Sequence, residues 1–299
     1  MSSANHASKG LTGPLLGIAC IAAAVFLLSS SDAIIKGVRA DLPTMEIITI
    51  RSVFGLIPVL VILHVQRAWS SLKTRRPVAQ IVRGGLIVVS YALFLEAIAV
   101  MPLATAVALT FSAPIFVAAL SPLVLGERVS LNRWFGVIVG FVGVLIIVQP
   151  HPDTFHPDAL FPLGAALAYA SASLLARRLG ATDPPAATAF FTGIMFFFGA
   201  APFVAAVPSA WVSPSTDHML LLALCGLVAG TAHFLIIAAY RHAQASVVAP
   251  FEYTALVWAA LFGLVFYDEL PDLVTFGGIA LIIGGGLWII YGERNRSAA

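Results

Sequence analysis

The residues of this chain that could do chemistry are charged side chains standing inside long apolar stretches. The clearest are Asp32, Arg51, Glu96 and Glu252. A charge within a lipid bilayer costs about 2.5–3.5 kcal/mol on insertion scales, so such residues are functional candidates by default. A carboxylate can accept a proton or hold an ammonium group, and the planar fork of a guanidinium matches a carboxylate through two parallel hydrogen bonds. These four residues are therefore the first candidates for a binding site.

Two of these charges have neighbours with which they can pair. Asp32 and Lys36 are four residues apart with the acid first, a spacing that predicts an ion pair along one helix face. Arg51 lies seven residues into the second apolar stretch, about 10 Å deep at 1.5 Å per residue. It can neutralise Asp32 across a helix pair or meet a substrate carboxylate, and both interpretations stay open. Glu96 and Arg83 lie near the ends of the third stretch and are expected to reach toward the interface.

Glu252 stands in an unusual local setting. Pro250 precedes it and Tyr253 follows it inside one apolar stretch. A proline within a helix removes a backbone hydrogen bond and bends the helix. A bend beside an acid predicts either a cavity wall or a proton-binding site. A corresponding segment earlier in the chain, 110–114, also has polar residues and a proline, but it has no charge.

Several aromatic and imidazole side chains lie in the middle of apolar stretches. Tyrosine and tryptophan usually prefer the membrane interface, so those at mid-depth need a hydrogen-bond partner or a wet cavity. A histidine at that depth either packs between helices through a hydrogen bond or serves a cavity or a proton relay. Packing therefore stays open as the alternative for each of them. With these residues included, we expect the substrate to contact Arg51, Tyr91, Tyr169, His233, Glu252, Tyr253 and Trp258.

The composition is that of an integral membrane protein. Hydrophobic residues make up 60% of the chain and charged residues 10%, with a mean hydropathy of +0.98, whereas a soluble domain carries about 25% charged residues. Cys20 and Cys225 fall within apolar stretches, where small packing residues are expected rather than a disulfide or a metal site. The chain has no GxxxxGK[ST] phosphate loop and no nucleic-acid signature. We therefore expect no cofactor, no nucleic-acid partner and no direct use of ATP.

The apolar residues form ten stretches, each long enough to cross a bilayer as a helix. We expect these helices over residues 14–36, 44–65, 77–98, 103–124, 131–148, 159–178, 185–207, 219–240, 245–266 and 272–291. Barrel strands are excluded because the stretches are too long and show no alternation of polar and apolar residues. The sequence therefore predicts an all-α integral membrane protein with ten transmembrane helices.

The basic residues lie almost entirely on one side of these helices. Twelve of the 16 Lys and Arg residues fall on the side of the N-terminus, two lie within spans, and only Lys36 and Arg39 fall on the opposite side. Cytoplasmic segments carry the excess of Lys and Arg. We therefore expect a multi-pass protein of the cytoplasmic (inner) membrane, with both termini in the cytoplasm.

One passage of the chain occurs twice, at residues 104–150 and 245–292. In it Ala118-Ala119-Leu120 matches Ala259-Ala260-Leu261, and after a one-residue shift Glu127, Gly136 and Gly143 match Glu269, Gly278 and Gly285. Because five spans separate the copies, the second copy crosses the membrane in the opposite direction. We expect two inverted five-helix repeats, 1–150 and 151–299, a design that provides two conformations open to opposite sides. The acids are expected to complement the dipole of the helix that follows, and the glycines to pack helices closely between halves or protomers.

These features resemble the drug/metabolite transporter superfamily, and in particular the EamA-type transporters with ten helices. The residues that carry the likeness are Leu125-Gly126-Glu127 and Tyr267-Asp268-Glu269-Leu270-Pro271 after spans four and nine, with Ala113-Pro114-Ile115 and Pro250-Phe251-Glu252-Tyr253 inside them. The likeness extends over nearly the whole chain as two copies. It implies a substrate cavity between the halves, and transport of small metabolites such as amino acids, nucleoside-like cofactors, riboflavin or sugars.

The leading hypothesis is a secondary carrier that exports a small amphipathic metabolite by alternating access. Amino acids are favoured because acidic, basic and aromatic side chains all occur within the spans. A carrier for a nucleoside-like cofactor or a vitamin stays open. A membrane-embedded lipid-modifying enzyme would need clustered carboxylates or histidines, and a channel would need a ring of like polar groups, whereas the acids here are scattered singly. The expected partners are the substrate and membrane lipids, with the chain as a monomer or homodimer.

Overall fold

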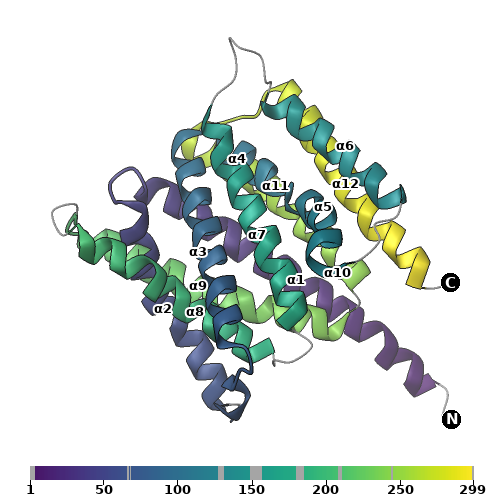
Figure 1. Ribbon diagram of the computed structural model, residues 1–299, viewed down its shortest axis with the longest axis horizontal. Coiled ribbons are helices and arrows are strands. Elements are labelled where there is room, and N and C mark those ends of the chain that lie inside the picture. Colours follow the sequence, from purple (N-terminus) through teal and green to yellow (C-terminus); the bar gives the residue numbers. More distant parts are fainter. Residues whose placement is uncertain are drawn as a thin grey trace.

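The protein folds into a bundle of helices. The computed structural model describes residues 4–65, 67, 69–126, 131–148, 157–179, 185–207, 211–243 and 245–297, and no strand occurs among them. The helices are α1 (Ala4–Val38), α2 (Thr44–Val65), α3 (Pro77–Val100), α4 (Leu103–Thr110), α5 (Ala113–Leu125), α6 (Leu131–Val148), α7 (Leu160–Leu179), α8 (Pro185–Ala206), α9 (Thr216–His242), α10 (Ala245–Glu252), α11 (Thr254–Tyr267) and α12 (Leu273–Ser297). The expected all-α membrane fold is confirmed. Each of the ten apolar stretches is helical, and α1 begins on the same side of the molecule as that on which α12 ends (Figure 1).

Two of the ten stretches are each broken into a pair of shorter helices. The fourth is divided into α4 and α5, and the ninth into α10 and α11. Ser112 and Tyr253 precede the second helix of each pair with nearly the same backbone angles, φ −71° and ψ −8° against φ −65° and ψ −13°. Proline contributes to both breaks, since Pro114 opens α5 and Pro250 lies inside α10, where each ring removes a backbone donor. The bend expected beside Glu252 is therefore present, and it recurs in the other copy.

The helices of the two halves of the chain, α1 to α6 and α7 to α12, interleave. The most extensive contacts of α1 are with α9 and those of α3 are with α7, while α2 packs on α8 and α6 on α12. In the order of the chain, α1 corresponds to α7, α2 to α8, α3 to α9 and α6 to α12. Under this correspondence the α1–α9 contact becomes the α3–α7 contact, and the other two contacts map onto themselves. The Cys225 thiol donates to the Ser31 carbonyl between α9 and α1, and the Ser90 hydroxyl donates to the Ala165 carbonyl between α3 and α7. The core is therefore formed between the two halves of the chain rather than within each half.

The glycines of α6 and α12 allow the two helices to touch backbone to backbone. A Cβ atom on Gly136 would lie 2.8 Å from the carbonyl oxygen of Gly285, and one on Gly143 would lie 2.6 Å from that of Gly278. Conversely, a Cβ atom on Gly285 would lie 2.6 Å from the carbonyl oxygen of Gly136, and one on Gly278 would lie 2.8 Å from that of Gly143. The expected glycine packing thus occurs between the two copies, where α6 and α12 lie side by side (Figure 1).

Two expectations about charged side chains were wrong. Lys36 pairs with Glu269 at 2.8 Å rather than with Asp32, because the loop after α11 comes next to the end of α1. Arg83 does not reach the interface: it is 6% exposed and donates to the Thr188 carbonyl of α8. Glu96 remains partly exposed, with 34% of its side chain accessible, and pairs with Arg39 at 2.7 Å.

The acid of the second repeated passage complements a helix dipole, but not the dipole of the helix that follows it. Glu269 Oε2 accepts a hydrogen bond of 3.0 Å from the backbone N–H of Leu103, the first residue of α4. A carboxylate at a helix N-terminus compensates the unpaired N–H groups there. The helix is one from the other half of the chain. The matching acid of the first copy, Glu127, lies outside the described residues.

Candidate functional site

A group of polar side chains from four helices lies between the two halves, and we call Asp32, Arg51, Tyr91 and His233 the central polar group. The Arg51 guanidinium carbon lies 4.7 Å from the centroid of the Tyr91 ring. Arg51 Nε and the Tyr91 hydroxyl are both buried, and neither has a hydrogen-bond partner among the described residues. An unpaired buried polar atom costs about 1–3 kcal/mol. Both groups can therefore donate a hydrogen bond to a ligand oxygen or to a water molecule.

Arg51 also connects the remaining members of the central polar group. It lies within electrostatic range of the Asp32 carboxyl on α1 and of the His233 imidazole on α9. The Nδ1 atom of His233 is 2.7 Å from the Ala229 carbonyl oxygen, which places the ring proton on Nδ1 and leaves Nε2 as an acceptor. Asp32 and Arg51 therefore interact electrostatically, but their described side chains do not come within ion-pair distance of each other. Together these side chains offer an anion-binding group, a carboxylate and an imidazole acceptor.

A second group, the lower polar group, contains Tyr169, Tyr240 and Glu252. The Tyr240 hydroxyl of α9 donates to Glu252 Oε1 at 2.5 Å, at the end of α10. Tyr169 on α7 is 51% exposed, and it lies within electrostatic range of both Glu252 and Arg83. Tyr169 therefore combines a half-exposed ring with charged neighbours on two other helices, α10 and α3.

Tyr253 and Trp258 lie outside both polar groups and pack against other aromatic rings. Tyr253 is 8% exposed and its ring packs at a tilt against that of Phe111, and its hydroxyl lies against the backbone of Gly286. Trp258 lies in an aromatic cluster, with its ring centroid 4.9 Å from that of Phe26 and 5.8 Å from that of Phe262. Of the seven expected substrate residues, the other five fall in the central and lower polar groups.

Sequence reasoning missed an ion-pair cluster that joins the two halves at one end of the bundle, which we call the Lys36–Glu269 clasp. Lys36 Nζ lies 2.8 Å from Glu269 Oε1 and donates to the Met101 carbonyl at 2.8 Å. The Tyr267 hydroxyl donates to the Ala33 carbonyl at 2.5 Å and so adds a second link. One signal in the sequence was available: Lys36 is one of only two basic residues on its side of the expected spans.

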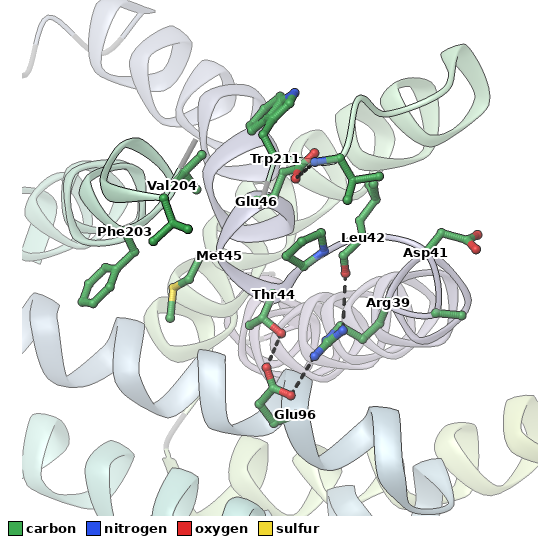
Figure 2. Close-up of a pocket in the computed structure, with 14 residues that line it drawn as sticks. Arg39, Asp41, Leu42, Thr44, Met45, Glu46, Glu96, Phe203, Val204 and Trp211 are labelled. Carbon is green, nitrogen blue, oxygen red and sulfur yellow. Dashed lines mark hydrogen bonds and ion pairs between the residues drawn. The ribbon is translucent and has the colours of Figure 1, made fainter. Parts of the chain in front are cut away.

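Sequence reasoning also missed a pocket at the same end of the bundle, which we call the end pocket. Its volume is about 660 Å³. It is lined by Arg39, Ala40, Asp41, Leu42, Pro43, Thr44, Met45, Glu46, Glu96, Phe203, Val204, Val207, Trp211 and Val212. Figure 2 shows Glu96 between Arg39 and Thr44, with Glu46 on the far side next to Trp211. Glu96 accepts hydrogen bonds of 2.7 Å from Arg39 and 2.5 Å from Thr44.

The described residues do not contain a metal-binding cluster. No group of three His, Cys, Asp or Glu side chains in the described ranges could hold an ion. The polar groups instead combine single charges with aromatic rings, an arrangement that suits the binding of a small organic molecule.

Known proteins resemble this chain along most of its length. The chain matches the EamA-like transporter family twice, over residues 15–149 and 158–291. It is 29% identical over 280 residues to the S-adenosylmethionine uptake transporter of Rickettsia bellii, covering 94% of this chain and 95% of that protein. It is 28% identical to the riboflavin transporter of Vibrio cholerae over 276 residues, covering 91% of each.

A further relative and one solved structure also align with most of the chain. The pseudopaline exporter CntI of Pseudomonas aeruginosa is 32% identical over 273 residues, which are 89% of this chain and 93% of the exporter. One crystal structure aligns with a TM-score of 0.63 at 20% identity, covering 95% of this chain and 98% of the other. That likeness is one of fold alone.

Proposed function

Because the chain belongs to the EamA-like transporter family, we propose that it is a secondary carrier that exports a small metabolite with an amino-acid head group. The chain is a multi-pass membrane transporter and not an enzyme. The alternative of a lipid-modifying enzyme is therefore removed. What the proposal adds is the class of substrate, the direction of transport and the residues that bind.

The central polar group is the observation that carries the proposal. Arg51 Nε and the Tyr91 hydroxyl are buried without partners among the described residues, so a substrate carboxylate can accept from both. Asp32 lies close enough to Arg51 to interact with it electrostatically and can take the ammonium group of the same substrate. A carboxylate and an ammonium group on one carbon are the head group of an amino acid.

The relatives support a substrate that also has a ring or a long side chain. S-adenosylmethionine combines an amino-acid head with an adenine ring, and riboflavin has a fused ring system, and carriers named for both resemble this chain. The residues of the lower polar group, Tyr169, Glu252 and Tyr240, would face the body of such a molecule. Tyr253 and Trp258 would act behind this layer by fixing the broken ninth span.

The distribution of basic residues supports an orientation with the clasp and the end pocket outside the cell. Lys36 and Arg39 belong to the basic-poor side, which faces outward by the positive-inside rule. The clasp would then close the outer end, and the exposed surfaces of Tyr169 and Tyr240 would be reached from the cytoplasm. This arrangement is consistent with loading from the cytoplasm. If the two repeats, 1–150 and 151–299, exchanged conformations, the protein would open to the outside. We expect it to act as a monomer or homodimer in the inner membrane.

Counterflow in proteoliposomes tests the substrate class. Purified protein would be loaded with unlabelled L-amino acids, S-adenosylmethionine or riboflavin, and entry of the labelled compound would be measured. We expect exchange of at least one compound with an amino-acid head, reduced about 10- to 100-fold by Arg51→Ala because a charge-assisted hydrogen bond contributes about 1.5–3 kcal/mol. Asp272→Asn, an exposed loop acid, serves as the matched control.

Two results would count against the proposal. One is exchange of riboflavin with no exchange of any amino-acid compound, which would favour the vitamin-carrier alternative. The other is an Arg51→Ala variant that exchanges as fast as the wild type. Direction is tested separately, by comparing net flux in inverted and right-side-out vesicles, and the proposal expects accumulation in the inverted ones.

A further inference from the structure

The end pocket has the dimensions of a ligand site and is separate from the central polar group. Its volume of about 660 Å³ lies within the range of about 300–1,000 Å³ that small-molecule sites occupy. Its walls come from both halves of the chain: the turn between α1 and α2, the start of α2 and the end of α3 on one side, and the end of α8 with the segment before α9 on the other. An occupant would therefore touch both halves at once.

The charged side chains that line the end pocket leave one carboxylate unbalanced. Arg39 and Glu96 neutralise each other at 2.7 Å. Asp41 is largely exposed, and its carboxylate lies 3.2 Å from His218 Nε2. Glu46 has no cation within ion-pair distance among the described residues. The pocket therefore favours a positively charged occupant.

Glu46 is also incompletely hydrogen bonded. The residue is 1% exposed, and its Oε2 accepts a hydrogen bond of 3.1 Å from the backbone N–H of Val212. Its Oε1 is buried with no partner among the described residues. A buried carboxylate oxygen without a donor is costly, and an ammonium group supplies both a donor and the opposite charge.

The wall of the end pocket formed by α8 and the segment before α9 is apolar and aromatic. Figure 2 shows Trp211 beside Glu46, and Phe203 with Val204 further along the same wall. Trp211 is 42% exposed and Phe203 is 63% exposed, although both are large apolar side chains. An aromatic ring attracts a cation over its face, and the same wall can cover the apolar part of a ligand.

We propose that the end pocket is a second ligand site, which binds a primary ammonium group carried on an apolar body. The ammonium group donates to Glu46 Oε1, and the apolar body packs on Trp211 and Phe203. The site does not depend on the substrate class proposed above, because none of its residues belongs to the central polar group. Such an ammonium group occurs both in free amines and in the headgroup of phosphatidylethanolamine.

Binding of phenethylamine to the protein in nanodiscs of phosphatidylcholine tests the proposal, with calorimetry as the readout. We expect phenethylamine to bind, and 2-phenylethanol and 3-phenylpropionate, which lack the ammonium group, not to bind. Glu46→Gln should weaken binding at least tenfold while keeping an acceptor for the Val212 N–H, and Trp211→Leu should weaken it several-fold. Glu46→Asp, which keeps the charge, and Asp272→Asn, which removes an exposed carboxylate, are the matched controls.

Two further arms separate the possible explanations. Asp32→Asn should retain phenethylamine binding even where it abolishes transport, so failure of the end pocket and failure of the proposed function are distinguishable. Nanodiscs containing phosphatidylethanolamine should lower the apparent affinity of the wild type if the lipid headgroup uses the site, and leave it unchanged if only free amines do. Absence of phenethylamine binding in phosphatidylcholine, or equal binding by wild type and Glu46→Gln, would overturn the proposal.

Discussion

The rings of Phe111 and Tyr253 pack against each other at a tilt of 34°, with their centroids 5.1 Å apart, at the points where the two broken spans are interrupted. Each ring comes from a different copy of the repeated passage. The Tyr253 hydroxyl extends past this contact to the backbone of Gly286 on α12. The two breaks are therefore connected to each other and to a third helix, and a change of angle at one break would be transmitted to the other.

Gly286→Ala should disturb this contact, because a Cβ atom at position 286 would overlap the Tyr253 hydroxyl. We expect a loss of about 1–3 kcal/mol in the free energy of unfolding, the usual range for overpacking. Removing the hydroxyl with Tyr253→Phe should restore much of it. Thermal unfolding of the purified variants measures both effects. Gly284→Ala is the control, since a Cβ atom there meets nothing within 4 Å, and a similar loss in that variant would contradict the explanation.

Neutralising the Lys36–Glu269 clasp should open the end of the bundle at which it lies. Glu269 would lose its ion pair with Lys36 in Lys36→Met and would keep only the Leu103 N–H. The readout is alkylation of Ala33→Cys, a buried position whose carbonyl accepts from Tyr267, in a background lacking the two native cysteines. We expect several-fold faster alkylation in Lys36→Met and in Glu269→Gln.

A double-mutant cycle then tests whether the two charges of the clasp act together. Contacting residues typically show interaction energies of about 0.5–3 kcal/mol, so the double variant should be less than additive. Strict additivity of the two single variants would mean that the ion pair does not hold this end closed. Arg39 and Glu96, which pair within the first half of the chain, provide the comparison.

Replacing Glu252 should reveal whether transport is coupled to protons. Its described contact is with the Tyr240 hydroxyl, and no described cation pairs with it. A carboxylate in that position can take up a proton without breaking an ion pair. We expect Glu252→Gln to retain exchange at equal pH but to lose the acceleration produced by a pH gradient. Tyr240→Phe, which removes only the hydroxyl, should retain that acceleration, and Glu252→Gln that still responds to the gradient would exclude the role.

Asp272 should make the stability of α12 dependent on pH. Side-chain and backbone hydrogen bonds from Thr275 lower the pKa of the Asp272 carboxyl from its usual value. Because the folded pKa is depressed, its stabilisation is present above the unfolded pKa and is lost as the pH falls through the folded pKa. Asp272→Ala should therefore lower the midpoint of thermal unfolding at pH 7 and not at a pH below both values. Asp272→Asn, which still caps the helix, should change it little.

The sequence was sufficient for the helices but not for the pairs of charges. The length of each apolar stretch determines a spanning helix, and Pro114 and Pro250 mark the two breaks, because these are local effects of the backbone. Lys36 and Arg83 were assigned local roles, but their partners Glu269 and Thr188 lie far along the chain. Only the interleaved packing brings such residues together.

The candidate site was predicted in part for the same reason. Arg51 was expected to neutralise Asp32 or to meet a substrate carboxylate, and Asp32 does lie within electrostatic range of it. Tyr253 was placed with the substrate because it stands beside Glu252 at the expected bend. Its ring packs on Phe111 and its hydroxyl lies against Gly286. The sequence did not predict this contact, because a glycine does not indicate which side chain will fill the space beside it.

The interleaving of α1 with α9 and of α3 with α7 has a consequence for how the protein is made. The ribosome delivers the first six helices to the membrane before the surfaces they pack on have been synthesised. Until α7 to α12 arrive, the small and polar faces of the early helices remain in contact with lipid or with the insertion machinery. The first half of the chain therefore cannot complete its packing until the second half has been inserted beside it.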